Sequence, residues 1–229
     1  MAAGTITALR AQAHESQRVN LFIDGEFALG VSLNTIAQEG LYVGKVLDEA
    51  AWLRLRATEY HNKALQLAMR YLDSRPRSAA ELREKLTRKE IPPEAIDSAL
   101  ARLQELGLVD DAAFARYWVE NRQILRPRGT QALRDELRRK GIDRNVIEAT
   151  VRDEELVGDQ SSGAWQLARK ALRKYAQSPD KQTFQRRMGG YLQRRGFSFD
   201  VIRPVIDGLW LELREAADRA ELAEPDDEL

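Results

Sequence analysis

The chain has 229 residues, in which 36 lysines and arginines balance 36 aspartates and glutamates, and it contains no cysteine. The missing cysteines exclude disulfides and thiolate chemistry and disfavour a zinc site. The first ten residues lack the charged leader and apolar block of a secretory signal, and no run approaches the roughly 18 apolar residues of a membrane helix. We therefore expect a cytoplasmic protein with no membrane association.

The first 59 residues predict a small β-rich module. Asp24 and Gly25 predict a tight hairpin turn, because an Asp-Gly pair readily adopts the positive φ that such a turn needs. Ser32 is expected to cap a short helix that ends near Gly40. A sheet this small should pack on the helices that follow it. The expected strands are residues 5–9, 19–23 and 26–31.

After residue 48 the apolar period becomes helical, and one pattern of five apolar positions occurs three times. The second copy lies 51 residues after the first, and the third lies 55 residues after the second. Copies of one unit at such spacing predict a repeat protein in which each unit buries its own apolar face. The fifteen positions are Leu82, Leu86, Ile91, Ile96 and Leu100; Leu133, Leu137, Ile142, Ile147 and Val151; and Met188, Leu192, Phe197, Ile202 and Ile206.

Helix start and stop signals divide each copy into three helices. Ser78 and Glu81 form a capping box, and Gly141 and Gly196 are expected to end helices in the left-handed conformation. The polar stretch from Gly158 to Gly163 predicts a linker. The expected fold is mainly α, with three tandem three-helix repeats in an elongated, curved arrangement after the β-rich module. The predicted units are residues 1–59, 60–111, 112–157, 162–209 and an acidic tail, 210–229.

The distribution of charge indicates an anionic partner. The net charge is +3 over residues 112–154, +5 over 155–209 and −6 over 210–229. A solvated helix surface followed by a solubilising tail would give the same pattern, so both interpretations stay open. The candidate partner-binding residues are Arg75, Arg77, Arg126, Arg128, Arg138, Arg139, Lys140, Arg186, Arg187, Arg194 and Arg195.

These eleven residues fall into two groups. Most lie near helix C-termini, where the helix dipole alone favours a positive charge. Four of them lie in loops before helix starts, where we expect no gain from the dipole and therefore either a partner or simple solvation. These four are Arg75, Arg77, Arg126 and Arg128.

No constellation in the sequence predicts catalysis. His14 and His61 have no partners at the spacing of a metal site or a catalytic triad, and no glycine-rich phosphate loop is present. The adjacent carboxylates Asp110 and Asp111 fit a helix start better than acid–base chemistry, because neighbouring helical residues point in different directions. We therefore expect a protein that is not an enzyme and uses neither a metal nor a cofactor.

Several motifs, in order along the chain, resemble the signature of RecX regulatory proteins. The resemblance covers about residues 60–209 and is weaker over the first 59 residues. The third repeat departs most, because Met188 and the pair Gly189-Gly190 replace a leucine-rich start. The motifs are Arg75-Pro76-Arg77-Ser78 with Glu81-Leu82 and Lys85-Leu86; Gly107-Leu108-Val109-Asp110-Asp111 with Phe114-Ala115 and Trp118; and Pro127-Arg128-Gly129 with Leu133, Glu136-Leu137 and Lys140-Gly141-Ile142.

The resemblance implies a monomeric regulator of the RecA recombinase in DNA repair, recombination and the SOS response. RecX proteins are thought to lie in the groove of the RecA–DNA filament, usually inhibiting ATP hydrolysis and strand exchange. Two other classes stay open. A three-helix unit also resembles a helix-turn-helix, so the chain could bind single- or double-stranded DNA directly. It could also be an adaptor for another helical assembly.

Overall fold

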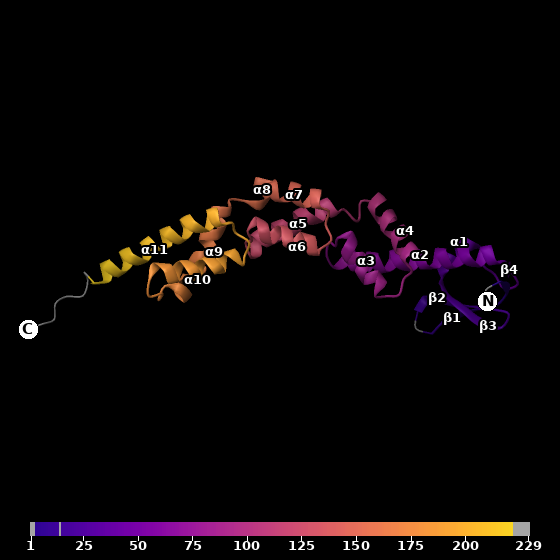
Figure 1. The fold of residues 1–229 in the computed structure, drawn as a ribbon. Helices are drawn as coiled ribbons and strands as arrows, with labels where there is room; N and C mark the ends of the chain where they lie inside the picture. The colour runs from indigo at the N-terminus through magenta and orange to yellow at the C-terminus, as the bar shows by residue number, and fades with distance from the viewer. Residues whose placement is uncertain (1–2, 14, 222–229) are drawn as a thin grey trace, which may run out of the picture. The chain divides into compact units, whose positions relative to one another are not determined.

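The computed structural model describes residues 3–13 and 15–221, so the end of the predicted acidic tail lies outside the described residues. The chain is mainly helical, with a small antiparallel sheet at its N-terminal end followed by the three-helix repeats (Figure 1). It divides into two compact units, residues 1–110 and 111–229. The predicted fold class, a mainly α chain of three-helix repeats after a β-rich module, is confirmed.

The sheet has four antiparallel strands in the order β3-β2-β1-β4. Asp24 and Gly25 have φ of 50° and 90°, which confirms the tight turn between β2 and β3. Ser32 caps α1 (Leu33–Glu39), and Gly40 ends that helix with φ of 55°. The sequence did not predict β4, because two residues are too few to show a period. The strands are β1 (Gly4–Gln12), β2 (Glu15–Ile23), β3 (Glu26–Ser32) and β4 (Val46–Leu47).

One long helix, α2 (Glu49–Ser74), joins the sheet to the first repeat. It begins at Asp48, whose side chain accepts a hydrogen bond of 2.7 Å from the backbone N–H of Ala51. Its first half packs Trp52 and Leu55 into the core under the sheet, and its second half contributes to the core of the first repeat. The predicted boundary between residues 59 and 60 therefore lies inside a continuous helix.

A buried carboxylate on α2 ties the sheet to this helix. Glu59 is almost fully buried, and its Oε2 accepts hydrogen bonds from the Ser32 backbone N–H at 2.8 Å and from Thr35 Oγ1 at 2.7 Å. Its Oε1 lies 2.9 Å from the guanidinium of Arg18 on β2. A buried charge is tolerated only where it is paired and hydrogen-bonded, so these contacts fix the position of α2 against β2 and α1.

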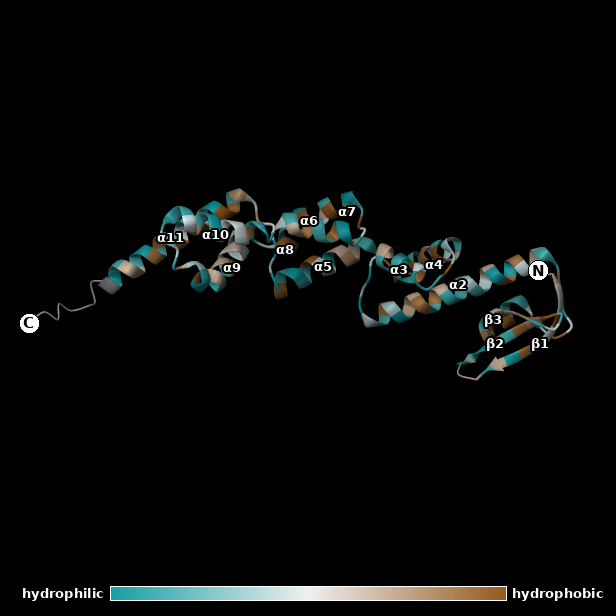
Figure 2. Ribbon diagram, turned by 60° about the horizontal axis from the view of Figure 1, so that its bottom comes forward, coloured by the Kyte–Doolittle hydropathy of each residue, from teal (hydrophilic) through white to brown (hydrophobic). Residues whose placement is uncertain are grey.

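Each repeat has its own hydrophobic core, and all fifteen positions of the repeated pattern are buried in these cores. Hydrophobic and hydrophilic residues alternate along each helix, as amphipathic helices require (Figure 2). The second half of α2 forms the first repeat with α3 (Ala79–Thr87) and α4 (Pro93–Glu105). The second repeat has α5 (Asp111–Leu125), α6 (Thr130–Arg139) and α7 (Arg144–Arg152), and the third has α9 (Gln160–Tyr175), α10 (Lys181–Gln193) and α11 (Phe199–Glu221).

The predicted linker from Gly158 to Gly163 is wrong. A short helix, α8 (Glu154–Val157), ends just before it, and α9 already begins at Gln160. The side chain of Asp159 accepts hydrogen bonds from the backbone N–H groups of Ser161 and Ser162, at 3.1 and 2.9 Å. The polar composition therefore marks a capped helix start, because a capping carboxylate satisfies backbone donors that a linker would leave to water.

The second and third repeats meet through backbone atoms. The Gly129 N–H donates to the Arg195 carbonyl at 2.9 Å, and the Gln131 N–H donates to the Gly196 carbonyl at 3.2 Å. A Cβ atom at Gly129 would lie 2.1 Å from the Gly196 oxygen, and one at Gly196 would lie 2.2 Å from the Ala132 nitrogen. Both positions therefore require glycine at this approach. Gly196 also ends α10 with φ of 85°, as predicted.

Truncating a fully buried position of the repeated pattern should destabilise the protein. Leu137 has no exposed surface in the second core, so Leu137→Ala should lower the free energy of unfolding by about 2–5 kcal/mol through lost burial and a cavity. Urea denaturation measures this change. A loss below about 0.5 kcal/mol would contradict the alignment of the repeats.

Two alanine variants separate the free-energy cost of crowding at Gly196 from the cost of a positive φ. Gly158 has φ of 69° with open space around its Cβ position, whereas Gly196 has φ of 85° and a backbone neighbour. Gly158→Ala should cost about 1–2 kcal/mol. Gly196→Ala should cost roughly 1–3 kcal/mol more because of overpacking. Equal losses for the two variants in urea denaturation would show that the close approach contributes nothing.

Candidate partner-binding surface

The two predicted arginines of the first repeat make contacts within their own loop. Arg75 donates to both carboxylate oxygens of Glu81 at 3.0 Å. Arg77 donates from Nε to the carbonyl of Tyr71, in the last turn of α2, at 2.9 Å. The expectation that loop arginines gain nothing from a helix dipole is therefore wrong for Arg77, because the loop also follows the C-terminus of α2, where a cation is favourable.

In the second repeat a half-buried carboxylate gathers several cations. Glu136 accepts hydrogen bonds from Trp118 Nε1 at 2.8 Å and from Arg122 Nε at 2.6 Å, and its Oε1 lies 3.6 Å from Arg128 Nε. The ammonium of Lys140 lies 4.6 Å from the centre of the Trp118 ring. Arg128 and Lys140 therefore contribute to the packing of this repeat. Glu136 is part of the second-repeat motif, but the sequence does not show that Trp118, Arg122 and Arg128 would all approach its carboxylate.

The remaining predicted residues are mostly exposed. Arg138 pairs with Asp135 at 3.0 Å, and Arg195 covers the ring of Tyr191 at 3.8 Å from its centre. Five others are exposed arginines whose side chains form no close ion pair and no hydrogen bond within residues 3–13 and 15–221. These five are Arg126, Arg139, Arg186, Arg187 and Arg194.

The glycine contact brings two of the predicted basic segments together. It joins the loop that contains Arg126 and Arg128 to the turn that contains Arg194 and Arg195. These segments are far apart in the sequence, so no local pattern predicts their proximity. The result is a basic junction, residues 126–129 and 194–196, between the second and third repeats.

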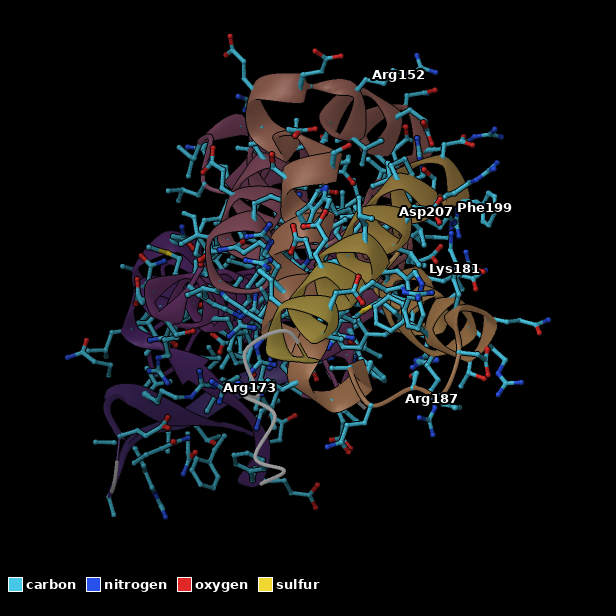
Figure 3. The ribbon with its side chains drawn as sticks, turned by 90° about the vertical axis from the view of Figure 1, so that its left-hand side faces the viewer. Arg152, Arg173, Lys181, Arg187, Phe199 and Asp207 are labelled. Atoms are coloured by element: carbon cyan, nitrogen blue, oxygen red, sulfur yellow. The ribbon has the colours of Figure 1, made fainter. Side chains whose placement is uncertain are left out.

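Other cations of the second and third repeats have carboxylate partners. Arg134 on α6 donates to Glu148 at 3.0 Å, and this hydrogen bond holds the pKa of the Glu148 carboxyl below its ordinary value. Lys181 on α10 lies 2.9 Å from Asp207 on α11, and its hydrogen bond lowers the pKa of Asp207 in the same way. Lys181 and Asp207 lie at the same edge of the third repeat in Figure 3. Fewer basic residues of these two repeats therefore lack a carboxylate partner than the net charge of the sequence indicates.

The described part of the chain contains no group of three histidine, cysteine, aspartate or glutamate side chains able to hold a metal ion. Within the same residues, no helix combines the length and the apolar character needed to cross a bilayer. The arrangement of exposed arginines suits the recognition of carboxylates or phosphates, because guanidinium presents several donors in a planar fork.

A small sheet followed by three three-helix domains, with separate cores and exposed arginines, defines a helical-repeat protein. Comparison with known protein families assigns the sheet and each three-helix domain to a family domain. The chain matches the RecX N-terminal domain over residues 4–48 and the first, second and third RecX three-helix domains over residues 64–103, 110–151 and 159–206. This chain belongs to the RecX family of regulatory proteins.

Individual relatives agree with this assignment. The regulatory protein RecX of Bacillus pumilus is 34% identical over 199 residues, which cover 86% of this chain and 74% of the relative. The protein of the same name in Bacillus subtilis is 30% identical over 217 residues, covering 95% and 81%. A crystal structure of a regulatory protein RecX covers 90% of this chain and 99% of its own, with 26% identity and a TM-score of 0.67.

The ion pair at Asp207 should be visible by titration. The pKa of this carboxyl is lowered because Lys181 donates to it, so the pair is present at neutral pH and is lost as the pH falls through the lowered pKa. NMR titration of the Asp207 carboxyl should show this low value, and Lys181→Met should move it upward. A Lys181→Met protein with an unchanged titration would contradict the assignment.

Proposed function

We propose that this protein is a non-enzymatic, cytoplasmic regulator of the RecA recombinase, acting as an inhibitor. It binds in the groove of the RecA–DNA filament and suppresses ATP hydrolysis, strand exchange and filament growth. The family assignment supports a regulatory role, since the relatives carry the name regulatory protein RecX.

The observation that carries the proposal is that five of the predicted binding residues are exposed and form no close side-chain ion pair or hydrogen bond within the described residues. They are Arg126, Arg139, Arg186, Arg187 and Arg194. A folded chain gains little from exposed cations that pair with nothing, whereas a filament of protein and DNA offers both carboxylates and phosphates. We expect Arg126 and Arg194, in the two segments of the basic junction, to make this contact.

The repeat architecture supplies the mechanism. Each repeat has its own core, so each presents a separate, rigid surface to the filament. Bound to neighbouring protomers at once, such a protein resists the subunit rearrangements that accompany ATP turnover. Contacts to two protomers also raise the apparent affinity through effective concentration.

The decisive experiment adds this protein to RecA on single-stranded DNA. We expect ATP hydrolysis to fall and filaments to shorten, measured by a coupled ATPase assay and electron microscopy. Unchanged hydrolysis together with unchanged filament length would refute the proposal.

A charge reversal tests the arginine contacts. Arg128→Glu would place a second carboxylate beside Glu136, so Arg126→Glu is the cleaner variant. Arg126 is exposed and unpaired in the described chain, and its reversal should weaken inhibition by about tenfold while leaving stability unchanged. Arg173→Glu, an equal charge change on α9, is the matched control (Figure 3). Equal inhibition by the natural protein, the Arg126→Glu variant and the Arg173→Glu variant would show that Arg126 is merely solvated.

Direct DNA binding is the second candidate, because the same exposed arginines can neutralise phosphates. Binding to free duplex DNA that neutralises Z phosphates weakens with a log–log salt slope near −0.9Z. A steep slope on free DNA, with no effect on RecA alone, would favour this candidate over filament regulation.

A further inference from the structure

The second and third repeats enclose a cleft of about 660 Å³ that the arginine pattern does not predict. It lies within residues 111–229 and is bounded by the start of α6, by α10 and by the start of α11. The backbone contact between Gly129 and Gly196 holds these three elements together at one end of the cleft.

Two adjacent glycines in the middle of α10 line this cleft, although glycine is the poorest helix former after proline. Gly189 has a packing reason, because a Cβ there would lie 3.3 Å from Ile206 Cδ1. Gly190 does not, because its Cβ position meets only the terminal Nη1 of the long Arg194 side chain, at 3.2 Å. Nothing in the packing of the described residues requires glycine at 190. The absence of a side chain at Gly190 keeps the cleft open and leaves the helix backbone accessible to a bound ligand.

The lining combines an apolar wall with few uncompensated charges. Ile202 and Ile206 form the wall, and the ring of Phe199 is 73% exposed at the rim. Phe199 stands away from the ribbon at the outer edge of the third repeat (Figure 3). The ring adds exposed apolar surface at the rim of the cleft, and covering it with an apolar side chain would be favourable.

Of the three arginines that line the cleft, only Arg186 forms no close ion pair among the described residues, and its carboxylate neighbour Asp180, which caps α10, acts on it at longer range. Arg134 is paired with Glu148, and Arg203 lies 4.0 Å from Asp207. A nucleic acid strand would bring several phosphates close to these two carboxylates and would meet two exposed cations, Arg186 on the lining and Arg194 beside Gly190. A peptide with a single carboxylate and a neighbouring apolar side chain matches the lining better, and the Gln193 amide can bond its backbone, whereas the Gln185 amide nitrogen already donates to Asp207 at 3.4 Å.

We infer that this cleft binds an acidic, partly apolar peptide segment of the filament protein. A carboxylate of the segment pairs with Arg186, its apolar side chain packs on Phe199 and Ile202, and its backbone passes over Gly190. The inference rests on the proposed function for the origin of the segment.

Because the chain has no native cysteine, a single introduced one can report what lies in the cleft. Gln193→Cys, on the cleft lining, is labelled with a benzophenone maleimide and irradiated on RecA filaments. We expect mass spectrometry to find a RecA peptide that contains an acidic residue beside an apolar one. The matched control is Gln166→Cys on α9, exposed and outside the cleft, which should not link that peptide. Links from Gln193→Cys to DNA, or the same peptide from both sites, would overturn the inference.

Affinity measurements separate the cleft from the proposed function. Gly190→Leu, which fills the cleft, and Arg186→Glu should each weaken filament binding by about tenfold or more. Gly190→Ala, which tests helix propensity with little added volume, and Arg173→Glu should stay within about threefold of the natural protein. If the folded Gly190→Leu and Arg186→Glu proteins inhibit RecA as well as the natural protein, the cleft inference fails while the proposed function stands. If the natural protein itself has no effect on RecA, the proposed function fails and the cleft inference fails with it.

Discussion

The backbone contact between Gly129 and Gly196 is the constraint on which the functional surface depends. A side chain at either position would collide with backbone on the other repeat, so the two repeats approach this closely only because both residues are glycine. The contact places the loop before α6 beside the turn after α10, which assembles the basic junction. The same contact sets the distance between α6 and α10, and therefore the width of the cleft.

Within each compact unit, small cores are coupled by one specific link. A three-helix domain of about 45 residues is close to the lower limit of independent stability, so its stability depends on its neighbours. In residues 1–110, α2 is shared by the sheet and the first repeat, and Glu59 fixes it against β2 and α1. In residues 111–229, the glycine contact has the corresponding role. The buried contacts of Glu59 and the close backbone approach at Gly129 and Gly196 thus have the same effect, because each fixes one small core against its neighbour.

The eleven predicted cationic residues show how a charge pattern becomes a binding surface. Arg75 and Arg128 lie close to carboxylates of their own repeat, whereas Arg126 and Arg186 form no close ion pair in the described chain. Both kinds of arginine look alike in the sequence, because the carboxylate partner is set by helix packing. Glu136 is the clearest case, since it serves cations from both α5 and the following loop. Folding therefore leaves part of the positive charge compensated and the rest available to a partner.

The sequence by itself determined the fold class, the fifteen buried positions and most helix ends, because helical period, capping side chains and left-handed glycines act within one or two turns. Only the tertiary structure decided the rest. The short strand β4 and the cleft depend on residues distant in the chain, and α8 is too short to show a period. The polar stretch after Gly158 was wrongly predicted to be a linker, because only the structure shows that Asp159 caps α9. Helix propensity disfavours glycine at position 190. The position of Gly190 on the lining of an open cleft becomes apparent only when α6 and α11 lie beside α10.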